Sequence, residues 1–416
     1  MANNNDNKVL NVPHLRFPEF SGEWKMCTIG ELTTKVGSGV TPRGGEAVYK
    51  TEGHPFVRSQ NVGLGNLLLD DIAFIDEETH LRQKSTELQF NDVLLNITGA
   101  SIGRSALVDK QIVGGNVNQH VCIIRTKENL VPSFICSFLL SNYGQRQIDS
   151  FQAGGNRQGL NFEQIKSIKI TIPSKDEQIK IAKLLRAIDE RIATQNKIIE
   201  KLQSLIKGLV DSLLENPSWE KVYLRSFMQF YSTNSLSWEQ LSYSNGNVRN
   251  LHYGLIHGFQ TSMIDSTLLP RILPNYQPKQ YTVCQDGDVA FADASEDTNE
   301  IGKAIEFSNT IDVKTVCGLH TIHGRDIKQN TILGFKGFAF NSRYFHDQVR
   351  RLAQGTKVYS ITAKNLSSCY VYIPDMIKQE NVVRLLNAYE ENLSLNRTLL
   401  NKYEIQKQYL LQQMLI

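Results

Sequence analysis

Several residues of this chain could carry out chemistry if the fold brought them together. Asp288 and the downstream triplet Asp312-Val313-Lys314 have the acidic and basic groups of a nuclease metal site. Triplets of the form Asp-x-Lys are common by chance, however. The first half of the chain has no such triplet at the position that matches residues 312–314. The Gly-rich segment 37–45 lacks the Gly-Lys-Ser/Thr sequence of a P-loop, so we expect a surface loop there. These patterns give catalysis little support.

The cysteines and histidines do not indicate a metal site. Six cysteines are scattered along the chain, none of them in a Cys-x-x-Cys pair, and no two histidines have metal-ligand spacing. We therefore predict reduced, structural thiols and no bound metal.

Polar side chains suited to nucleic acid lie in Gly-rich, loop-like segments. Arg can contact guanine through two hydrogen bonds, Asn and Gln can contact adenine, and Gly lets the backbone approach a phosphate closely. The candidates in the first half are Arg43, Arg58, Gln60, Asn61, Arg104, Asn116, Asn118, Gln119, Asn156, Arg157 and Gln158, with Ser59, Thr98 and Ser101 in the same segments. The candidates in the second half are Arg249, His252, Tyr253, Lys279, Ser295, Lys303, His323, Arg325, Lys357 and Tyr359.

Other interpretations of these residues remain open. Any one of them could belong to an ordinary solvated turn. The formal net charge is only +3, so nucleic acid would be bound by local basic patches and not by the global field. The best matched pair of contacts is Arg157 and Lys357, because each follows a Gly at nearly the same distance.

The elements that must position these residues occur twice. A pattern that begins at Trp24 restarts at Trp219, and Asp92-Val93 recurs as Asp288-Val289. The string 102–104 recurs at 301–303, 160–165 at 361–366, and Ile172-Pro173 at Ile373-Pro374. A repeat of this length predicts two homologous globular domains and not a solenoid. His120 and His320 align across the repeat; we interpret them as structural histidines, with DNA contact as the alternative.

Each copy is expected to be a mixed α and β domain followed by a long helix. Strand-length apolar runs occur at 92–97 and 120–124, whereas 131–150 has a helical pattern. Apolar residues in 179–214 and again after 374 alternate in steps of four and three, which is a heptad pattern. The predicted helix-pair core is Ile181, Leu185, Ile188, Ile192, Gln195, Ile199, Leu202, Leu386, Tyr389, Leu393, Asn396, Leu400 and Tyr403.

Sustained heptads with a polar residue at matching core positions favour pairing of the two helices as an antiparallel coiled coil. The alternative is that each amphipathic helix packs only on its own domain. The sequence thus predicts an α+β protein with a tail at 1–20, a first domain at 21–173, a helix at 174–216, a second domain at 217–374 and a helix at 375–416. The Asn-rich start has no apolar signal region, so we expect a cytoplasmic protein.

The whole chain resembles specificity subunits of type I restriction-modification systems. The strings that carry the resemblance are 12–20 ahead of Trp24, Arg58-Ser59-Gln60-Asn61-Val62, 97–103, 118–121 and the helix entry 172–192. The resemblance implies two target recognition domains that each read one half of a split double-stranded DNA sequence. It also implies two modification subunits that methylate adenine with S-adenosylmethionine, and restriction subunits that translocate and cut DNA. The specificity subunit is then not a catalyst and holds no cofactor itself.

The second copy departs from this pattern. Arg58-Ser59-Gln60-Asn61 has no evident counterpart in it, and 98–101 becomes Ala294-Ser295-Glu296-Asp297. Two other functions stay open: a stand-alone DNA methyltransferase or endonuclease, and a coiled-coil scaffold with no DNA role. The first lacks support because no Asn/Asp-Pro-Pro-aromatic sequence is present.

Overall fold

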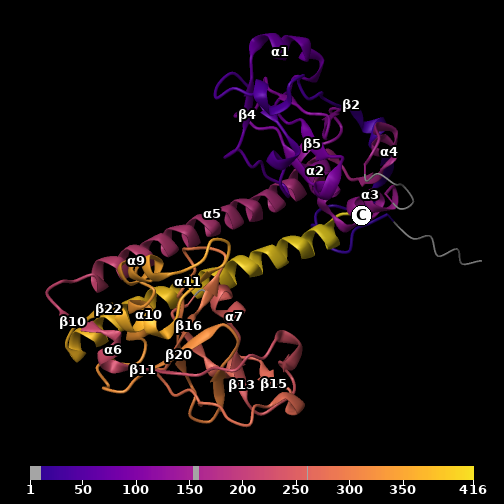
Figure 1. Ribbon diagram of the computed structural model, residues 1–416. Coiled ribbons are helices and arrows are strands. Elements are labelled where there is room, and N and C mark those ends of the chain that lie inside the picture. The colour runs from indigo at the N-terminus through magenta and orange to yellow at the C-terminus, as the bar shows by residue number, and fades with distance from the viewer. Residues whose placement is uncertain (1–10, 153–158, 260) are drawn as a thin grey trace, which may run out of the picture. The chain divides into compact units, whose positions relative to one another are not determined.

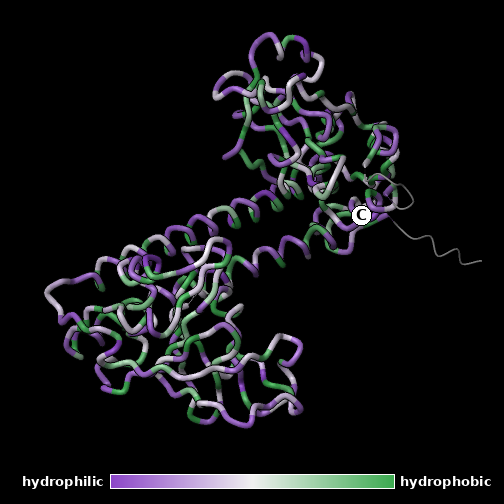
Figure 2. The backbone as a smooth tube through the Cα atoms, viewed as in Figure 1, coloured by the Kyte–Doolittle hydropathy of each residue, from purple (hydrophilic) through white to green (hydrophobic). Residues whose placement is uncertain are grey.

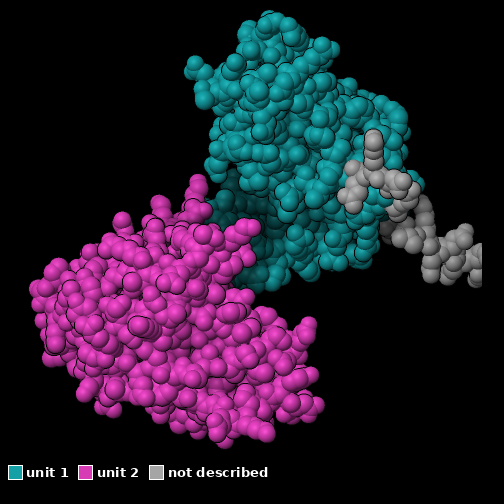
Figure 3. Space-filling view, viewed as in Figure 1, with its two compact units in different colours: residues 1–196, 398–416 teal, residues 197–397 magenta. Residues whose placement is uncertain are grey.

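The computed structural model describes residues 11–152, 159–259 and 261–416. They form two compact units (Figure 3): unit 1 contains residues 1–196 and 398–416, and unit 2 contains residues 197–397. Two long helices, α5 (Lys175–Leu214) and α11 (Met376–Met414), each contribute to both units (Figure 1). Each unit therefore consists of one mixed domain together with a segment of each long helix.

The first domain is built on a four-stranded antiparallel sheet beside a three-stranded one. The four-stranded sheet has the order β2 (Thr33–Ser38), β8 (Val121–Thr126), β5 (Val93–Asn96) and β6 (Ser105–Leu107). The three-stranded sheet has the order β4 (Ala73–Ile75), β3 (His54–Val57) and β7 (Asn116–Val117), and β1 (Lys25–Thr28) pairs with β9 (Lys169–Ile172). The apolar runs expected to form strands are β5 and β8.

The helices of the first domain differ from the prediction at one point. The segment 131–150 is helical as expected, with Pro132 at the start, but it is divided into α2 (Pro132–Leu140) and α3 (Asn142–Ser150). Ser141 adopts an extended conformation between them, and its Oγ caps α3 by accepting from the N–H of Gly144 at 3.3 Å. A Ser that offers an N-cap competes with helix continuation, which explains the break. The short helices α1 (Glu77–Arg82) and α4 (Phe162–Ser167) complete the domain.

The second domain repeats this architecture with extensions. Its main sheet has the order β11 (Met228–Tyr231), β20 (Thr321–Asp326), β16 (Val289–Ala292), β18 (Ala304–Ser308) and β14 (Met263–Asp265). Beside it lie β12 (Leu241–Ser242), β15 (Arg271–Ile272), β13 (Arg249–Leu251) and β19 (Thr315–Cys317), and two pairs join β10 (Glu220–Tyr223) to β22 (Tyr370–Ile373) and β17 (Ala294–Ser295) to β21 (Tyr359–Ser360). Its helices are α6 (Leu224–Phe227), α7 (Tyr253–Gly258), α8 (Phe335–Ala339), α9 (Arg343–Leu352) and α10 (Ala363–Ser368).

The strand registers confirm that the two domains are homologous. Leu94 of β5 lies opposite Ile123 of β8, and Ala290 of β16 lies opposite His323 of β20. The parallel pairs also correspond, since Val57 faces Val117 in the first domain and Leu251 faces Cys317 in the second. The structure therefore assigns an equivalent position even where the two sequences have no visible similarity.

The two long helices pair in an antiparallel arrangement, as predicted. In unit 1, the start of α5 shares a hydrophobic core with the end of α11: Ile181, Leu185 and Ile188 are buried in one cluster with Leu410 and Met414. In unit 2, the end of α5 shares a core with the start of α11, and this cluster contains Val210, Leu214, Val382, Val383 and Leu386. Each helix thus packs on a domain and on the other helix together.

Every position of the predicted seam is buried or half-buried. Ile181, Leu185, Ile188, Gln195, Ile199, Leu386 and Leu393 are buried, and Ile192, Leu202, Tyr389, Asn396, Leu400 and Tyr403 are half-buried. Near the end of α5 the buried positions are Val210 and Leu214, whereas Leu209 and Leu213 are only partly covered. A straight helix drifts away from a strict heptad repeat because it has 3.6 residues per turn, which accounts for this one-residue displacement.

Each long helix is attached to its own domain by an equivalent glutamine. The side chain of Gln178 accepts from the N–H of Val131 at 2.8 Å and donates to the carbonyls of Asn129 and Pro173, both at 3.1 Å. The side chain of Gln379 makes the same three bonds to Ile332, Asn330 and Pro374 at 2.9, 2.9 and 3.0 Å. Both glutamines are 1% exposed. These bonds fix the direction in which each helix leaves its domain.

The two ends of the chain lie together in unit 1. The N–H of Leu15 donates to the carbonyl of Gln413 at 2.9 Å, and Arg16 forms an ion pair with Glu177 at 2.8 Å. Residues 11–20, expected to be part of a tail, are therefore anchored to both long helices. Figure 2 shows apolar and polar residues interspersed along α5 and α11. Among the described helices, none combines the length and the hydrophobicity that crossing a bilayer requires.

Candidate nucleic-acid interface

A polar cluster lies in the loops after β2, β5 and β7 of the first domain, near the end of β3, which pairs with β7. Thr98 Oγ1 and His120 Nδ1 are hydrogen-bonded at 2.6 Å, and His120 Nε2 lies 2.9 Å from Gln119 Nε2. The Oε1 of Gln119 accepts from the N–H and the hydroxyl of Thr41. Arg43, two residues further along the same Gly-rich loop, is exposed. The predicted residues Thr98 and Gln119 are thus brought together, and His120 joins them.

Arg58 and Gln60 lie directly after β3 but are engaged by acidic residues. Arg58 pairs with Asp71 at 3.1 Å and donates to its carbonyl at 2.7 Å, while Glu46 lies 3.9 Å away. Gln60 donates to the carboxylate of Asp71. An incoming phosphate would have to compete with Asp71 for both side chains, and no local pattern predicts this contact.

Three predicted residues of the first domain are buried. Asn61 accepts from the N–H of Arg58 at 3.0 Å, Asn116 is hydrogen-bonded to His80 at 2.7 Å, and Asn118 accepts from the N–H of His120 at 3.0 Å. Their geometry is suited to shaping the loops that carry the exposed residues. Ser59 and Ser101 are half-buried, and Arg104 is exposed on the turn after β5.

The candidates Asn156, Arg157 and Gln158 lie outside the described residues. Gly159, which follows them, forms a β-bridge with Thr98. In the second domain the equivalent contact is the pairing of Ala294 with Ser360 in β17 and β21, where Ser295 also pairs with Tyr359. Lys357, two residues before Tyr359, is exposed.

An aromatic cluster occupies the equivalent strand ends of the second domain. Because Val57 corresponds to Leu251, the counterpart of Arg58-Ser59 is His252-Tyr253, which sequence comparison did not reveal. The ring of His252 lies 4.6 Å from that of Trp238 and 4.7 Å from that of Tyr253, measured between centroids. Tyr253 in turn packs edge-on against His320 at 5.2 Å. Trp238 was not selected from the sequence, since nothing local to it indicates this contact.

The charge state of this cluster follows from its burial. Desolvation, assisted by the nearby His320, lowers the pKa of His252, so this ring is neutral at pH 7. Its Nδ1 accepts from the N–H of Gly254 at 3.2 Å, which leaves Nε2 as the protonated nitrogen. Burial raises the pKa of Asp293 despite the opposing effect of His320, whose Nδ1 lies 3.2 Å from the carboxylate. The cluster therefore offers aromatic faces and hydrogen-bond donors rather than a strong positive charge.

Other predicted residues of the second domain lie elsewhere. Arg325 holds both carboxylate oxygens of Asp288, at 2.8 and 2.6 Å, and His323 is buried 2.7 Å from the same group. Arg249 donates to the carbonyl of Leu269, and Lys279 is exposed. Desolvation raises the pKa of Asp288, but its bonds to Arg325 and His323 outweigh that effect and the net shift is downward.

The Asp288–Arg325 pair is structural. In the first domain Arg125 holds Asp92 in the same way, with both bonds at 2.7 Å. A pair that recurs in both cores, with its carboxylate fully engaged, does not correspond to the nuclease metal site considered from the sequence.

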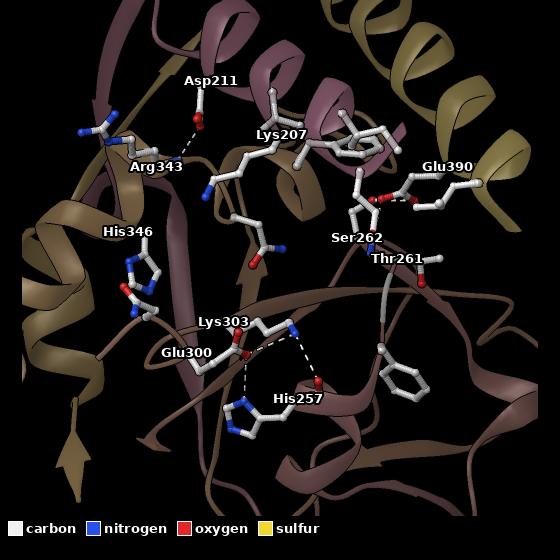
Figure 4. Close-up of a pocket in the computed structure, with 18 of the residues that line it drawn as sticks. Lys207, Asp211, His257, Thr261, Ser262, Glu300, Lys303, Arg343, His346 and Glu390 are labelled. Atoms are coloured by element: carbon white, nitrogen blue, oxygen red, sulfur yellow. Dashed lines mark hydrogen bonds and ion pairs between the residues drawn. The ribbon is translucent and has the colours of Figure 1, made fainter. Parts of the chain in front are cut away.

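Lys303 lies in a cleft of about 690 Å³ within unit 2 (Figure 4). The cleft is lined by the end of α5, by α9, by part of α11 and by the loop before β14. Glu300 contacts His257 at 3.3 Å and Lys303 at 3.2 Å, and Asp211 accepts from the backbone N–H of Arg343 at 2.8 Å. Glu390 accepts from the N–H of Ser262 at 3.0 Å, and burial raises the pKa of this carboxyl to about 7.

Comparison with known proteins places this geometry in context. Residues 21–204 match the family described as the Type I restriction modification DNA specificity domain. The provisionally named type I restriction enzyme MjaX specificity subunit of Methanocaldococcus jannaschii is 20% identical over 421 residues, covering 96% of this chain and 94% of that protein. The type I restriction enzyme EcoKI specificity subunit of Escherichia coli is 23% identical over 203 residues, covering 46% and 41%.

A solved structure has the same fold. The S subunit of a type I restriction-modification system from M. genitalium superposes with a TM-score of 0.59 at 15% identity, covering 97% of this chain and 99% of that one. The likeness extends over both domains and both long helices.

Proposed function

Because this chain belongs to the family of DNA specificity subunits of type I restriction-modification systems, whose members are not themselves catalysts, we propose that it reads a bipartite double-stranded DNA target, one half with each domain. The observation that carries this proposal is the repeated placement of polar and aromatic residues on loops at equivalent strand ends. In the first domain the exposed Gln119 follows β7, and in the second the exposed His320 follows β19 and the half-buried Tyr253 follows β13. The two domains differ at equivalent positions, since Ser59 corresponds to Tyr253 and Gln119 to Leu319, and such differences suit two different half-sites.

Each half-site is assigned to one domain of the chain. We propose that residues 21–173 and 217–374 are the two target recognition domains. In the first, Arg43, Gln119 and Arg104 are the best candidates for DNA contact, because they are exposed and have no acidic partner among the contacts of the described residues. In the second, Tyr253, Ser295, Lys357 and Tyr359 are the best candidates, with Lys279 as a further phosphate contact.

The partners proposed for this chain are two modification subunits and the restriction subunits of the same complex. The modification subunits would bind S-adenosylmethionine and methylate adenine, and this chain would direct them to the target. An internal repeat supplies two similar faces in one chain, so two copies of one partner can bind it in equivalent ways. Since chromosomal DNA is the substrate, we propose that the complex acts in the cytoplasm.

The test is to map adenine methylation across a genome that expresses this chain with its modification subunits. Exchange of residues 21–173 for the first domain of another family member should change one half-site and leave the other intact. If both half-sites changed although the protein remained folded, the division into two reading domains would be wrong. Methylation or cleavage of DNA by the rigorously purified single chain would instead favour a stand-alone enzyme.

A further inference from the structure

Three side chains that are far apart in the sequence meet in the core of the second domain. The sulfur atoms of Cys284 and Cys317 are 3.7 Å apart, and these atoms and one ring nitrogen of His323 all lie within 4.8 Å of one another. The residues are 2%, 2% and 0% exposed. Thiol sulfur and imidazole nitrogen are the ligands that zinc prefers.

The two nitrogens of His323 have different surroundings. Nε2 lies 2.7 Å from the carboxylate of Asp288, which is itself held by Arg325. Nδ1 is buried and has no hydrogen-bond partner. Buried polar atoms without a partner are rare, and a metal-bound His commonly donates its other N–H to a carboxylate. His323 is therefore oriented as a ligand would be, with Nδ1 left available.

The separation of the sulfurs, which as thiols are within hydrogen-bond distance of each other, excludes a disulfide and fits a shared ion. Two thiolates at about 2.3 Å from a tetrahedral zinc ion are roughly 3.8 Å apart by geometry. The sulfurs of a disulfide are only about 2.0 Å apart. The 3.7 Å between Cys284 and Cys317 matches the first arrangement.

The first domain shows that the fold does not need these residues. Ile123 occupies the position of His323, since Leu94–Ile123 and Ala290–His323 are equivalent pairs. Val117 occupies the position of Cys317, because Val57 and Leu251 are their respective parallel neighbours. Leu88 occupies the position of Cys284, as each lies four residues before the aspartate of the repeated Asp–Arg pair.

The three first-domain counterparts, Leu88, Val117 and Ile123, are all buried and apolar. The substitution of an apolar trio by two thiols and an imidazole adds polar groups to a core that packs without them. Such an exchange costs solvation free energy unless the groups find a partner.

We propose that Cys284, Cys317 and His323 form a binding site for a thiophilic divalent cation of the zinc type. The two sulfurs would bind as thiolates and Nδ1 of His323 as a neutral imidazole, and the two thiol protons would be released to solvent as the ion binds. These three side chains supply three of the four positions of the tetrahedron. The ion would connect β19, β20 and the segment before β16, so its role would be structural. This site differs from the prediction of no metal made from the sequence.

The test is the zinc content of the full-length protein. The chain is purified under reducing conditions, incubated with zinc, passed through a chelating column and analysed by mass spectrometry of the elements. One equivalent of zinc is expected. Bound zinc should also raise the Tm by about 5 °C, since a ligand that binds only the folded state stabilises it.

The decisive variant carries the residues of the first domain: Cys284→Leu, Cys317→Val and His323→Ile together. It should fold, because the equivalent core already packs with these side chains, and its zinc should fall to background. The matched control is Cys369→Ala, a buried thiol of the same domain, which should keep one equivalent. Cobalt should produce a sulfur-to-metal charge-transfer band in the wild-type protein and in the control but not in the triple variant.

Three results would overturn the proposal. The first is a wild-type protein that retains no zinc after reconstitution. The second is a triple variant that retains the metal. The third is a disulfide between Cys284 and Cys317 in the zinc-reconstituted protein purified under reducing conditions, detected by peptide mass.

Discussion

The Nζ of Lys407 lies 2.6 Å from Oδ1 of Asp189 and 3.1 Å from the carbonyl oxygen of Leu64. Lys407 interrupts the heptad pattern of α11, and its side chain is 13% exposed. Asp189 is on α5, so the pair joins the two helices inside unit 1, and Leu64 joins both to the first domain. A cation at this core position is tolerated because two acceptors surround it.

Removal of this cation should destabilise unit 1. We expect Lys407→Met to lower the free energy of unfolding by about 1 to 2 kcal/mol, since Leu64 and Asp189 lose their donor. A double-mutant cycle with Asp189→Asn, measured by urea denaturation, should give a coupling of about 1 kcal/mol, because Asp189 is 37% exposed and solvent weakens the pair. The Arg186–Glu190 pair on α5, which is far more exposed, is the control and should couple by less than about 0.5 kcal/mol. Equal coupling in the two cycles would contradict this account.

The glutamines that fix the long helices should be sensitive to truncation. Gln178→Ala or Gln379→Ala removes three hydrogen bonds and leaves buried backbone groups unpaired, so each should cost about 2 to 4 kcal/mol. The amides of Val131 and Ile332 should then exchange faster with deuterated solvent. Gln408→Ala, at an exposed position of α11, serves as the control. Unchanged exchange at Val131 in Gln178→Ala would mean that other contacts hold α5 in place.

The stability of unit 2 should depend on pH through Glu390. Burial raises the pKa of this carboxyl to about 7, above the unfolded value of about 4.3. The folded state then favours the protonated form, so the contribution of Glu390 is fully present below the unfolded value and is lost as the pH rises to about 7. Glu390→Gln should raise the Tm at pH 8 by about 2 to 4 °C and have little effect at pH 4.5. Glu391→Gln, at the exposed neighbouring position, should shift neither value.

The exposed cations of the two proposed interfaces should contribute to DNA affinity in a salt-dependent way. Arg43→Ala and Lys357→Ala, each assembled with the modification subunits, should weaken binding of a cognate duplex. If the side chain contacts a phosphate, the slope of log K against log salt should fall by about 0.9. If it contacts a base, the loss should be about 1 to 3 kcal/mol and confined to one half-site. Arg186→Ala is the control, and affinity equal to wild type in both variants would remove these residues from the interface.

The long helices should set the unread spacer between the half-sites. One heptad inserted after Asn196 and another after Arg397 preserves the phase of the seam and adds about 10 Å of helix. That length corresponds to roughly three base pairs at 3.4 Å each. Methylation mapping should then recover both half-sites with a longer spacer. A folded, active protein with the original spacer would show that the helices do not determine the separation.

Local sequence patterns predicted most of the helices and strands of this protein. They did not predict which distant segments contact one another. The heptad positions Ile181 and Leu386 are buried as expected, because helical periodicity is a local property. The break at Ser141 was missed, since capping by a single hydroxyl competes with a strong apolar pattern. The correspondence of Arg58 with His252 depends on strand register and has no signal in the sequence.

The candidate site was predictable only in part for the same reason. Arg43 and Lys357 are exposed on loops, as their Gly-rich surroundings suggested. Asn116 and His323 come from equally polar strings but are buried, because β7 and the first four residues of β20 are covered on both faces. Arg58 forms an ion pair with Asp71, thirteen positions further along the chain. Composition does not reveal such a pair.

The bond between Leu15 and Gln413 gives the polypeptide nearly the topology of a closed ring. A ring has no preferred starting point, so the chain could begin at another exposed loop if a short linker joined residue 416 to residue 11. The connection at 215–218, between α5 and β10, is such a loop. A protein that starts there would have its two domains in reversed order along the gene, yet every strand pairing and both glutamine attachments would be preserved. Gene rearrangement could therefore exchange the order of the two recognition modules without building a new fold.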